Sequence, residues 1–440
     1  MVVGSFLTQI MTTTPRSKSS SDSLTCRIPF FYGWVMLPII MIVQIATSPG
    51  QTFGISVFNP YLVESLNLTQ SELSGAYMMG TLLASLPMVL VGAAMDRYGP
   101  RRALFVVVLL FGGACYVMSN VTGLFSLFFA FLFLRMLGQG AMGLLGTNSL
   151  ALWFNRNLGF ASGIGSLAAT LVFSTIPALH LYLIHAFGWK DAYVLLGIGV
   201  WVVVLPLLIP FRNRPEDVGQ WSDGRREAHR QANRPSERAG RASESDLTLS
   251  EALRTRSYWI MISATAVFSM VVTGMTFNTV QLFLDHGLSE RTAAATFIST
   301  GIASAAARLG AGILADRIRL NILLSISMTV TVLGILLAIV MSTPLVAHGY
   351  AVVTGIARGI YLAVDATLWV RYFGRANLGK IRGSLTTVGV AASSLGPFLM
   401  GYAHDSLGDY DFVLWIFALV LYTPLVMITL LATPPREKSQ

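Results

Sequence analysis

Apolar residues are gathered into twelve long runs, six on each side of one polar stretch. A helix needs about 20 such residues to cross the hydrocarbon core of a bilayer. The pattern therefore predicts an all-α membrane protein with twelve spanning helices, at 31–62, 72–95, 103–120, 123–152, 158–187, 190–211, 257–286, 291–315, 321–342, 346–370, 380–404 and 412–432.

The polar stretch that separates the two sets of runs, residues 212–256, holds ten arginines and eight acidic residues among Ser, Gly and Pro. It has too little apolar surface to fold alone and is expected to be a flexible linker. The predicted domains are a tail at 1–30, a six-helix bundle at 31–211, the linker at 212–256, a second bundle at 257–432 and a tail at 433–440.

Composition agrees with this pattern, since 54% of the residues are apolar and 12% are charged. A soluble domain has roughly 25% charged residues. The net charge of +9 does not indicate nucleic-acid binding, because the basic residues are scattered over short loops rather than gathered on one face. No cofactor and no metal are expected, since Cys26 and Cys115 are the only cysteines and no histidine stands at ligand spacing.

The basic residues also predict the orientation of the chain. The tails and the even-numbered connections carry 25 of the 30 Lys and Arg residues, whereas the opposite loops carry Lys190 and Arg291. Positive residues accumulate in cytoplasmic loops. Both termini and the linker are therefore expected in the cytoplasm, in a plasma or inner membrane.

Glycine, proline and charged residues near the ends of the apolar runs recur 220 positions further along the chain. This repeat indicates two halves of similar structure. The matched pairs include Gly92 with Gly312, Asp96 with Asp316, Arg97 with Arg317, Pro177 with Pro397 and Asp191 with Asp411. Two homologous six-helix halves predict a pseudo-twofold axis along the membrane normal and a cavity between the halves near the midplane.

The chain resembles the major facilitator superfamily in its twelve spans, its central linker and the Gly-x-x-x-Asp-Arg loop that begins at Gly92 and recurs at Gly312. Four further stretches resemble the monocarboxylate transporter and oxalate/formate antiporter branch: FYGWV at 31–35, WFNRNLGFASGIG at 153–165, RYFGRANLGKIRG at 371–383 and SLGPFLMGYAHDSLGDYD at 394–411. The resemblance implies two six-helix bundles that rock about a central site.

The same resemblance gives the loop motif a gating role. It implies that Asp96 faces the start of the eleventh span and Asp316 the start of the fifth, where each closes the cytoplasmic side. A carboxylate is well placed at the positive N-terminus of another helix. Asp96, Arg97, Asp316 and Arg317 are therefore the predicted gate residues, although anchoring of the topology alone would also account for them.

Three arginines fall inside predicted spans, where each costs roughly 2.5 to 3.5 kcal/mol unless it faces a cavity or a partner. Arg308 and Arg358 lie in the C-terminal half at the depth of the expected cavity. The guanidinium fork fits a carboxylate bidentately and stays charged. Carriers of this branch have a substrate-binding arginine in the eighth span, and ARLGAGILAD puts Arg308 there. Arg358 is the second substrate-binding candidate. The alternative role is a structural ion pair for Arg308 and stabilisation of the fold for Arg358.

Two differences between this sequence and the carriers of that branch narrow the range of expected substrates. The residue one turn before Arg308 is Ser304 rather than an acid, and the first span has no lysine. In the eleventh span Lys380 sits at the cytoplasmic mouth and nothing deeper is basic. A dianion would lack the second fixed cation that the oxalate carriers use, so the sequence favours a monoanion.

Asp365 is an acidic residue well inside a span, seven positions from Arg358 on the same helical face. It is expected either to neutralise the arginine of the empty site or to carry a coupled proton. Arg135, in the fourth span, matches an arginine found in many members of the superfamily. That match implies a role in coupling or in packing against the fifth span.

Four more polar side chains are weaker candidates for the substrate site. Asn59 and Asn278 occupy corresponding places in the first and seventh spans, Gln281 lies one turn beyond Asn278, and Tyr361 one turn from Arg358. Interhelical hydrogen bonds would explain each of them equally well.

These observations predict a secondary transporter that moves a small organic monocarboxylate by alternating access, coupled to protons or to anion exchange. The protein is expected to act as a monomer in the bilayer. An exporter of hydrophobic compounds and a non-transporting sensor of small acids are the alternatives. An enzyme is not expected, because no nucleophile and base, metal cluster or paired carboxylates stand at helical spacing in the spans.

Overall fold

The computed structural model describes residues 30–155, 157–224, 247–315, 317–374 and 377–432. These residues form helices joined by short connections, without a strand in the ranges given. The first group of helices comprises α1 (Gly33–Ile45), α2 (Thr52–Ser56), α3 (Asn59–Leu66), α4 (Gln70–Ala84), α5 (Met88–Tyr98), α6 (Pro100–Ser119), α7 (Leu124–Leu134), α8 (Gly143–Trp153), α9 (Leu158–Phe187) and α10 (Trp189–Leu207).

The second group follows the linker. It comprises α12 (Leu249–Ala252), α13 (Arg256–Phe277), α14 (Thr279–Asp285), α15 (Glu290–Leu314), α16 (Leu320–Ile339), α17 (Pro344–Phe373), α18 (Leu378–Leu407), α19 (Asp411–Trp415) and α20 (Thr423–Leu430). The described parts of the linker contain two short 3₁₀ turns, Pro215–Val218 and Ser222–Gly224, besides α12. The tails at 1–29 and 433–440 and the linker residues 225–246 lie outside the described residues.

Ten of the described helices, or runs of joined helices, are long and apolar enough to cross a membrane. The predicted second and eleventh spans are not among the ten. The second is divided between α4 and α5 by a break before Met88, and α18 contains many Ser, Thr and Gly residues. Both α4 and α18 pack against the other half of the protein.

Besides the second span, which breaks before Met88, the first and the seventh predicted spans are also interrupted. The first changes direction at the 3₁₀ turn Ser48–Gly50, because Pro49 has no N–H to donate and Gly50 packs against the Leu134 carbonyl, with no room for a side chain. The seventh breaks between α13 and α14 at Asn278. Interrupted helices leave backbone groups free for partners near the middle of a transporter.

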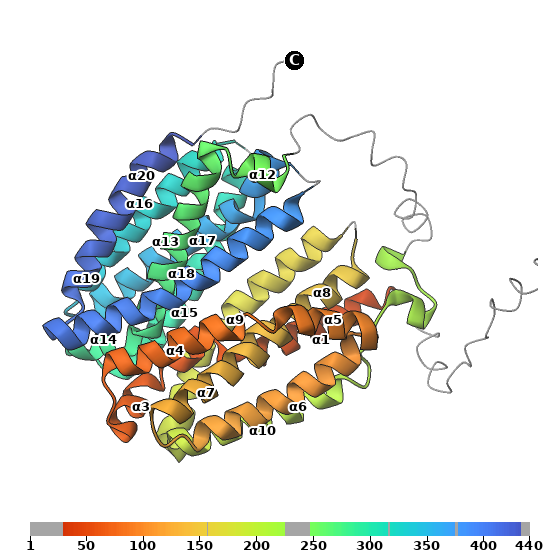
Figure 1. Ribbon diagram of the computed structural model, residues 1–440, viewed down its shortest axis with the longest axis horizontal. Helices are drawn as coiled ribbons and strands as arrows, with labels where there is room; N and C mark the ends of the chain where they lie inside the picture. Colours follow the sequence, from red (N-terminus) through yellow and green to blue (C-terminus); the bar gives the residue numbers. More distant parts are fainter. Residues whose placement is uncertain (1–29, 156, 225–246, 316, 375–376, 433–440) are drawn as a thin grey trace, which may run out of the picture.

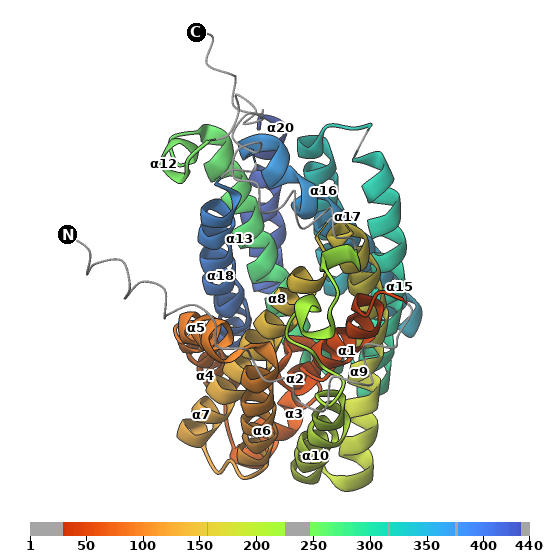
Figure 2. The ribbon, with the colours of Figure 1, turned by 90° about the vertical axis from the view of Figure 1, so that its right-hand side faces the viewer.

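The two groups of helices form a V (Figure 1). They are close together at the end that contains α3, α4 and α14, and further apart at the end that contains α5 and α12. Two helix pairs make the main contacts between the halves, α4 with α18 and α9 with α15. Figure 2 shows the same division from the side, with α13 and α18 above α8 and α2.

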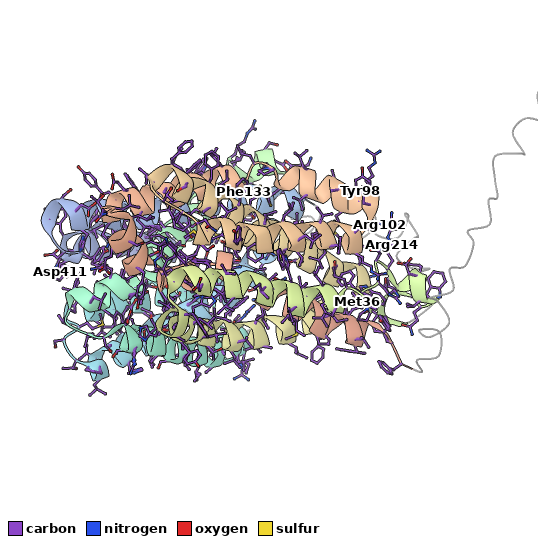
Figure 3. The ribbon with its side chains drawn as sticks, turned by 90° about the horizontal axis from the view of Figure 1, so that it is seen from below. Met36, Tyr98, Arg102, Phe133, Arg214 and Asp411 are labelled. Atoms are coloured by element: carbon purple, nitrogen blue, oxygen red, sulfur yellow. The ribbon has the colours of Figure 1, made fainter. Side chains whose placement is uncertain are left out.

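We call the two ends of the molecule the closed end and the open end. Asp411 marks the closed end, and Tyr98, Arg102 and Arg214 lie at the open end (Figure 3). The arrangement is a pair of bundles that touch through one end.

Candidate functional site

Arg358 lies midway along α17, and its side chain is exposed despite that depth. It lines a cavity of about 60 Å³ in the C-terminal half. The walls come from α13, α14, α15, α16 and α17 and carry six threonines, Thr276, Thr279, Thr296, Thr300, Thr331 and Thr354. Phe268 and Phe297 supply apolar wall. A space of this size holds a few water molecules or one small chemical group.

Most of these threonine hydroxyls donate their protons to their own helices. The acceptors are the carbonyls of Met275 for Thr279, Ala293 for Thr296, Thr296 for Thr300, Ser327 for Thr331 and Tyr350 for Thr354. A hydroxyl that donates to its backbone keeps its oxygen lone pairs as acceptors. The walls can therefore accept hydrogen bonds from the Arg358 guanidinium, directly or through water.

The backbone of Arg308, on α15, lies next to the part of α17 that carries Arg358. Its helix crosses α17 at Gly359, where a side-chain carbon would lie 2.9 Å from the Arg308 backbone nitrogen and would also meet the Ser304 carbonyl. The Arg308 side chain is half-buried, and the Ser304 hydroxyl is buried with no hydrogen-bond partner in the described part of the chain. Because the helices cross closely here, the backbones of Arg308 and Arg358 lie near each other at the middle of the membrane.

Asp365, the acidic residue closest in sequence to Arg358, does not pair with it in this conformation. Asp365 accepts a hydrogen bond from Trp369 Nε1 at 3.0 Å through Oδ1. The ion pairs found between described residues do not include Arg308 or Arg358. The two arginines thus retain their charge for another partner.

Tyr361 stands one turn from Arg358 and is buried against Phe268, with ring centroids 3.6 Å apart and planes 11° from parallel. Phe268 lines the cavity, so Tyr361 supports the wall from behind. The other weaker candidates lie at the closed end. Asn59 donates to the Phe277 carbonyl at 2.7 Å, Asn278 to the Gly274 carbonyl at 3.0 Å, and Gln281 to Asp285 at 2.8 Å. In this conformation these three amides hold protein partners and do not line the cavity around Arg358.

Arg135 is buried within the N-terminal half, with 5% of its surface exposed. Its guanidinium donates to Thr81 Oγ1 at 3.2 Å and to the Gly50 carbonyl at 3.2 Å, and it lies 5.0 Å from the centre of the Tyr77 ring. It opens the π-helical segment Arg135–Met142, a wide turn that is common at functional sites. Arg135 ties the interruption of the first span to the second and fourth spans.

One seam at the closed end joins α4 to α18. Asp405 accepts hydrogen bonds from the backbone N–H groups of Gln70, at 3.1 Å, and Ser71, at 2.7 Å. Its carboxylate therefore sits at the positive N-terminus of a helix from the other half. Gly401 packs against Ser74 and the Gln70 carbonyl with no space for a side chain.

The other seam joins α9 to α15. His185 Nε2 lies 2.6 Å from Glu290 Oε1, and the Tyr61 hydroxyl donates to Glu290 Oε2 at 2.7 Å. His185 and Asp405 are 220 positions apart, and so are Gln70 and Glu290, because 405 − 185 and 290 − 70 both equal 220. The two seams are therefore built from equivalent positions of the repeat, with different chemistry at each.

The residues predicted to gate the cytoplasmic side lie at the open end. Asp96 and Arg97 are exposed at the end of α5, with the Arg97 guanidinium 5.4 Å from the Tyr98 ring centre. Arg317 is also exposed, and Asp316 lies outside the described residues. In this conformation Asp96 and Arg97 have no bond to α18 among those found between described residues.

Sequence reasoning did not find the threonine cavity or the seam residues. A threonine that bonds its own helix gives no periodic signal, so the cavity needed coordinates. The repeat did not reveal the seam residues either, because His185 and Asp405, like Gln70 and Glu290, lie 220 positions apart but differ in residue type.

Comparison with known proteins places the chain among transporters. The family model described as Major Facilitator Superfamily matches residues 40–347 and 273–440. An uncharacterized transporter of this superfamily from Escherichia coli is 24% identical over 79% of this chain and 82% of its own length. A probable sulfoacetate transporter of Cupriavidus necator is 28% identical over 33% of this chain. That match spans only 34% of the sulfoacetate transporter.

A solved structure supports the fold. A bacterial homologue of the human lysosomal transporter Spinster, in an inward-facing and unoccupied conformation, aligns over 91% of this chain and 95% of its own, with a TM-score of 0.64 and 15% identity. An occupied form of that homologue gives a TM-score of 0.65 at 14% identity. The family model, the transporter relatives and the helices long enough to span a bilayer agree. The chain is therefore a multi-pass membrane transporter, rather than an enzyme, and belongs to the major facilitator superfamily.

Proposed function

We propose that this transporter moves a small organic monocarboxylate, with Arg308 and Arg358 as the cations that bind it. The observation that carries the proposal is the exposed Arg358 in the middle of α17, beside Arg308 and without a carboxylate partner in the described residues. A fixed positive charge at this depth is costly unless a mobile anion or water compensates it. A carboxylate supplies that compensation and fits the guanidinium fork.

The charge balance favours one negative charge per substrate. Arg308 and Arg358 contribute two positive charges, and ionised Asp365 on the same helix removes one. A monocarboxylate would then leave the occluded site neutral, as burial of the site requires. A dianion would need Asp365 to be protonated, which links substrate charge to proton coupling. The sulfoacetate that one relative is named for carries two acidic groups, so it belongs in any substrate panel.

The conformation supports alternating access. With the orientation predicted from the Lys and Arg distribution, the closed end faces outward and the open end faces the cytoplasm. Asp96, Arg97, Asp316 and Arg317 would then form the cytoplasmic gate in the opposite state, with Asp96 against the start of α18. Asn59 would lose its bond to the Phe277 carbonyl when the closed end opens, because that bond joins the two halves. Asn278 and Gln281 would keep their partners within the C-terminal half, and Tyr361 supports the cavity wall through Phe268.

Uptake of radiolabelled monocarboxylates into proteoliposomes tests the proposal, with and without an inward proton gradient. The parent should take up at least one acid saturably, and Arg308→Ala should reduce that uptake about 30-fold or more, since removing one partner of a desolvated charge pair costs roughly 2 to 5 kcal/mol. Arg254→Ala removes an exposed arginine that lies outside the site and is the control, with uptake expected to stay within about twofold because surface charges contribute little.

Two outcomes would contradict this reading. If the well-folded parent moves no acid from the panel, even in counterflow, the carboxylate proposal fails. If an acid is transported equally by Arg308→Ala and the parent, the transport class stands but Arg308 is a structural charge.

Asp365→Asn separates the two roles expected of Asp365. If Asp365 carries the coupled proton, the variant should lose accumulation driven by a proton gradient, while exchange of labelled for unlabelled acid continues at about the parent rate. Loss of both activities would indicate a charge-balancing role. Accumulation and exchange at parent levels would exclude Asp365 from both. Asp191→Asn, at the first turn of α10, is the control for loss of an acidic residue outside the site.

A further inference from the structure

A groove of about 520 Å³ runs between α9 and α15 near the closed end. Its floor is formed by the small residues Ala178, Ala186, Ala294 and Ala295, and Tyr182 and Arg291 stand among its polar residues. The two walls come from different halves of the protein. The groove therefore exists only while these two helices lie against each other as they do here.

The groove opens away from the interior of the bundle. His180 is fully buried, with Nδ1 3.1 Å from the Gly54 carbonyl, so that face of α9 points inward. Tyr182 is two residues further on and is 67% exposed. Successive residues of an α-helix are about 100° apart, so these two side chains point in nearly opposite directions. The groove side of α9 therefore faces the lipid of the bilayer.

The equivalent place in the seam between α4 and α18 holds a phenylalanine. Phe398 occupies the repeat position of Ala178, since 398 − 178 is 220, and Gly75 occupies that of Ala295, since 295 − 75 is 220. The Phe398 ring lies 3.6 Å from where a Gly75 side chain would begin. At this place one seam therefore has a large aromatic side chain, and the other has an alanine that lines the groove.

The polar groups of the groove are suited to an anion. Arg291 is exposed, and the ion pairs within the described ranges do not include it. The neighbouring Glu290 is already occupied by His185 and Tyr61. An apolar floor open to lipid, with a free guanidinium and a phenol beside it, matches an acyl chain joined to a phosphate.

We propose that the groove binds an anionic phospholipid from the leaflet at the closed end. Its acyl chain takes the place that Phe398 fills in the other seam, and its phosphate contacts Arg291 and Tyr182. Bilayer lipid competes for the apolar contact of the acyl chain, so the contact of Arg291 with the phosphate provides the preference for an anionic lipid. Because both halves form the groove, the bound lipid stabilises the conformation that is closed at this end.

Native mass spectrometry of the detergent-purified protein, titrated with phosphatidylglycerol or phosphatidylcholine, tests the proposal. The parent should retain phosphatidylglycerol more strongly than phosphatidylcholine. Ala178→Phe, which installs the side chain of the other seam, should weaken retention of both lipids about tenfold, as expected for the loss of roughly 1.4 kcal/mol. Arg291→Gln should remove the preference for phosphatidylglycerol, about fivefold for roughly 1 kcal/mol. Lys190→Gln, the other basic residue of the loops at this end, should change neither.

Equal lipid retention by Ala178→Phe and the parent would overturn the groove as the site, and an unchanged preference in Arg291→Gln would overturn the phosphate contact. Ala295→Phe fills the groove from the opposite wall and decides the matter if Ala178→Phe does not fold. Dimers of the parent that disappear in both phenylalanine variants would assign the groove to a second copy of the chain and refute the lipid proposal.

Discussion

Replacing Gly401 by leucine is expected to open the closed end of the molecule. A side-chain carbon at this position would lie 2.5 Å from the Gln70 carbonyl oxygen and would also meet Ser74, so the first turn of α4 would have to move. Overpacking costs typically about 1 to 3 kcal/mol. The clash belongs to one conformation, since α4 and α18 come from different halves. The population of this conformation relative to its opposite should fall roughly 5-fold to more than 100-fold.

The opposite change is expected at the other end of the same helix. Gly383 lies near the start of α18, and a side chain there would have no atom within 4 Å in this conformation. Gly163, at the equivalent position of α9, is equally uncrowded. If the open end closes by bringing these helix starts against the other half, Gly383→Leu should oppose closure and stabilise the conformation seen here. The two leucine variants should therefore shift the equilibrium in opposite directions.

Double electron–electron resonance measures this shift. Spin labels at Ser65→Cys and Leu284→Cys, which are exposed on α3 and α14, report the separation of the halves at the closed end. The Gly401→Leu variant should show a longer distance, and Gly383→Leu a shorter or unchanged one. Gly113→Leu is the control, since it adds the same side chain to α6 where no atom lies within 4 Å. An unchanged distance in Gly401→Leu would show that the contact at Gly401 does not limit opening.

The architecture could be predicted from the sequence because it repeats. The repeated pairs, such as Asp96 with Asp316 and Pro177 with Pro397, indicated two equivalent halves. The lengths of the apolar runs indicated the helices in each half. The family is confirmed by the comparisons. The interruptions at Ser48–Gly50 and before Met88 were missed although Pro49, Gly50 and Pro87 mark them, because hydropathy averaged over a whole span does not register a short break.

The site could be predicted only in part. A costly charge in an apolar run is visible in the sequence, so Arg135, Arg308 and Arg358 all stood out. The sequence did not show that these arginines lie in different environments. Arg135 is bonded to Thr81 and Gly50, whereas Arg358 lines a cavity. Which end is closed is also beyond sequence, because two conformations of one chain share every residue and differ by a few kcal/mol in contacts.

Replacing Arg358 by glutamine is expected to abolish carboxylate transport while leaving the fold intact. Arg358 has no hydrogen bond or ion pair to another described residue, so its removal breaks no contact that holds the helices together. Glutamine keeps donors but loses the charge that draws an anion to mid-membrane depth. The loss of a desolvated charge partner costs about 2 to 5 kcal/mol, so uptake should fall by roughly 30-fold to more than 1,000-fold.

Arg135→Gln is the contrasting variant, because it removes the same charge from a bonded position. It leaves the Gly50 carbonyl and Thr81 without their donor in a buried place. Charge-assisted hydrogen bonds contribute about 1.5 to 3 kcal/mol each, so this variant should be destabilised by several kcal/mol. Thermal unfolding in detergent should show a clear decrease for Arg135→Gln and almost none for Arg358→Gln.

Arg358→Lys then distinguishes charge from geometry. Lysine restores the positive charge but not the planar fork, so it should recover binding without the full rate if the carboxylate is held bidentately. Uptake near the parent level in Arg358→Gln would mean that the charge is dispensable. In that case the cavity would serve only to hydrate Arg358, and the anion site would rest on Arg308 alone. Thermal destabilisation of Arg358→Gln equal to that of Arg135→Gln would instead assign Arg358 to the fold.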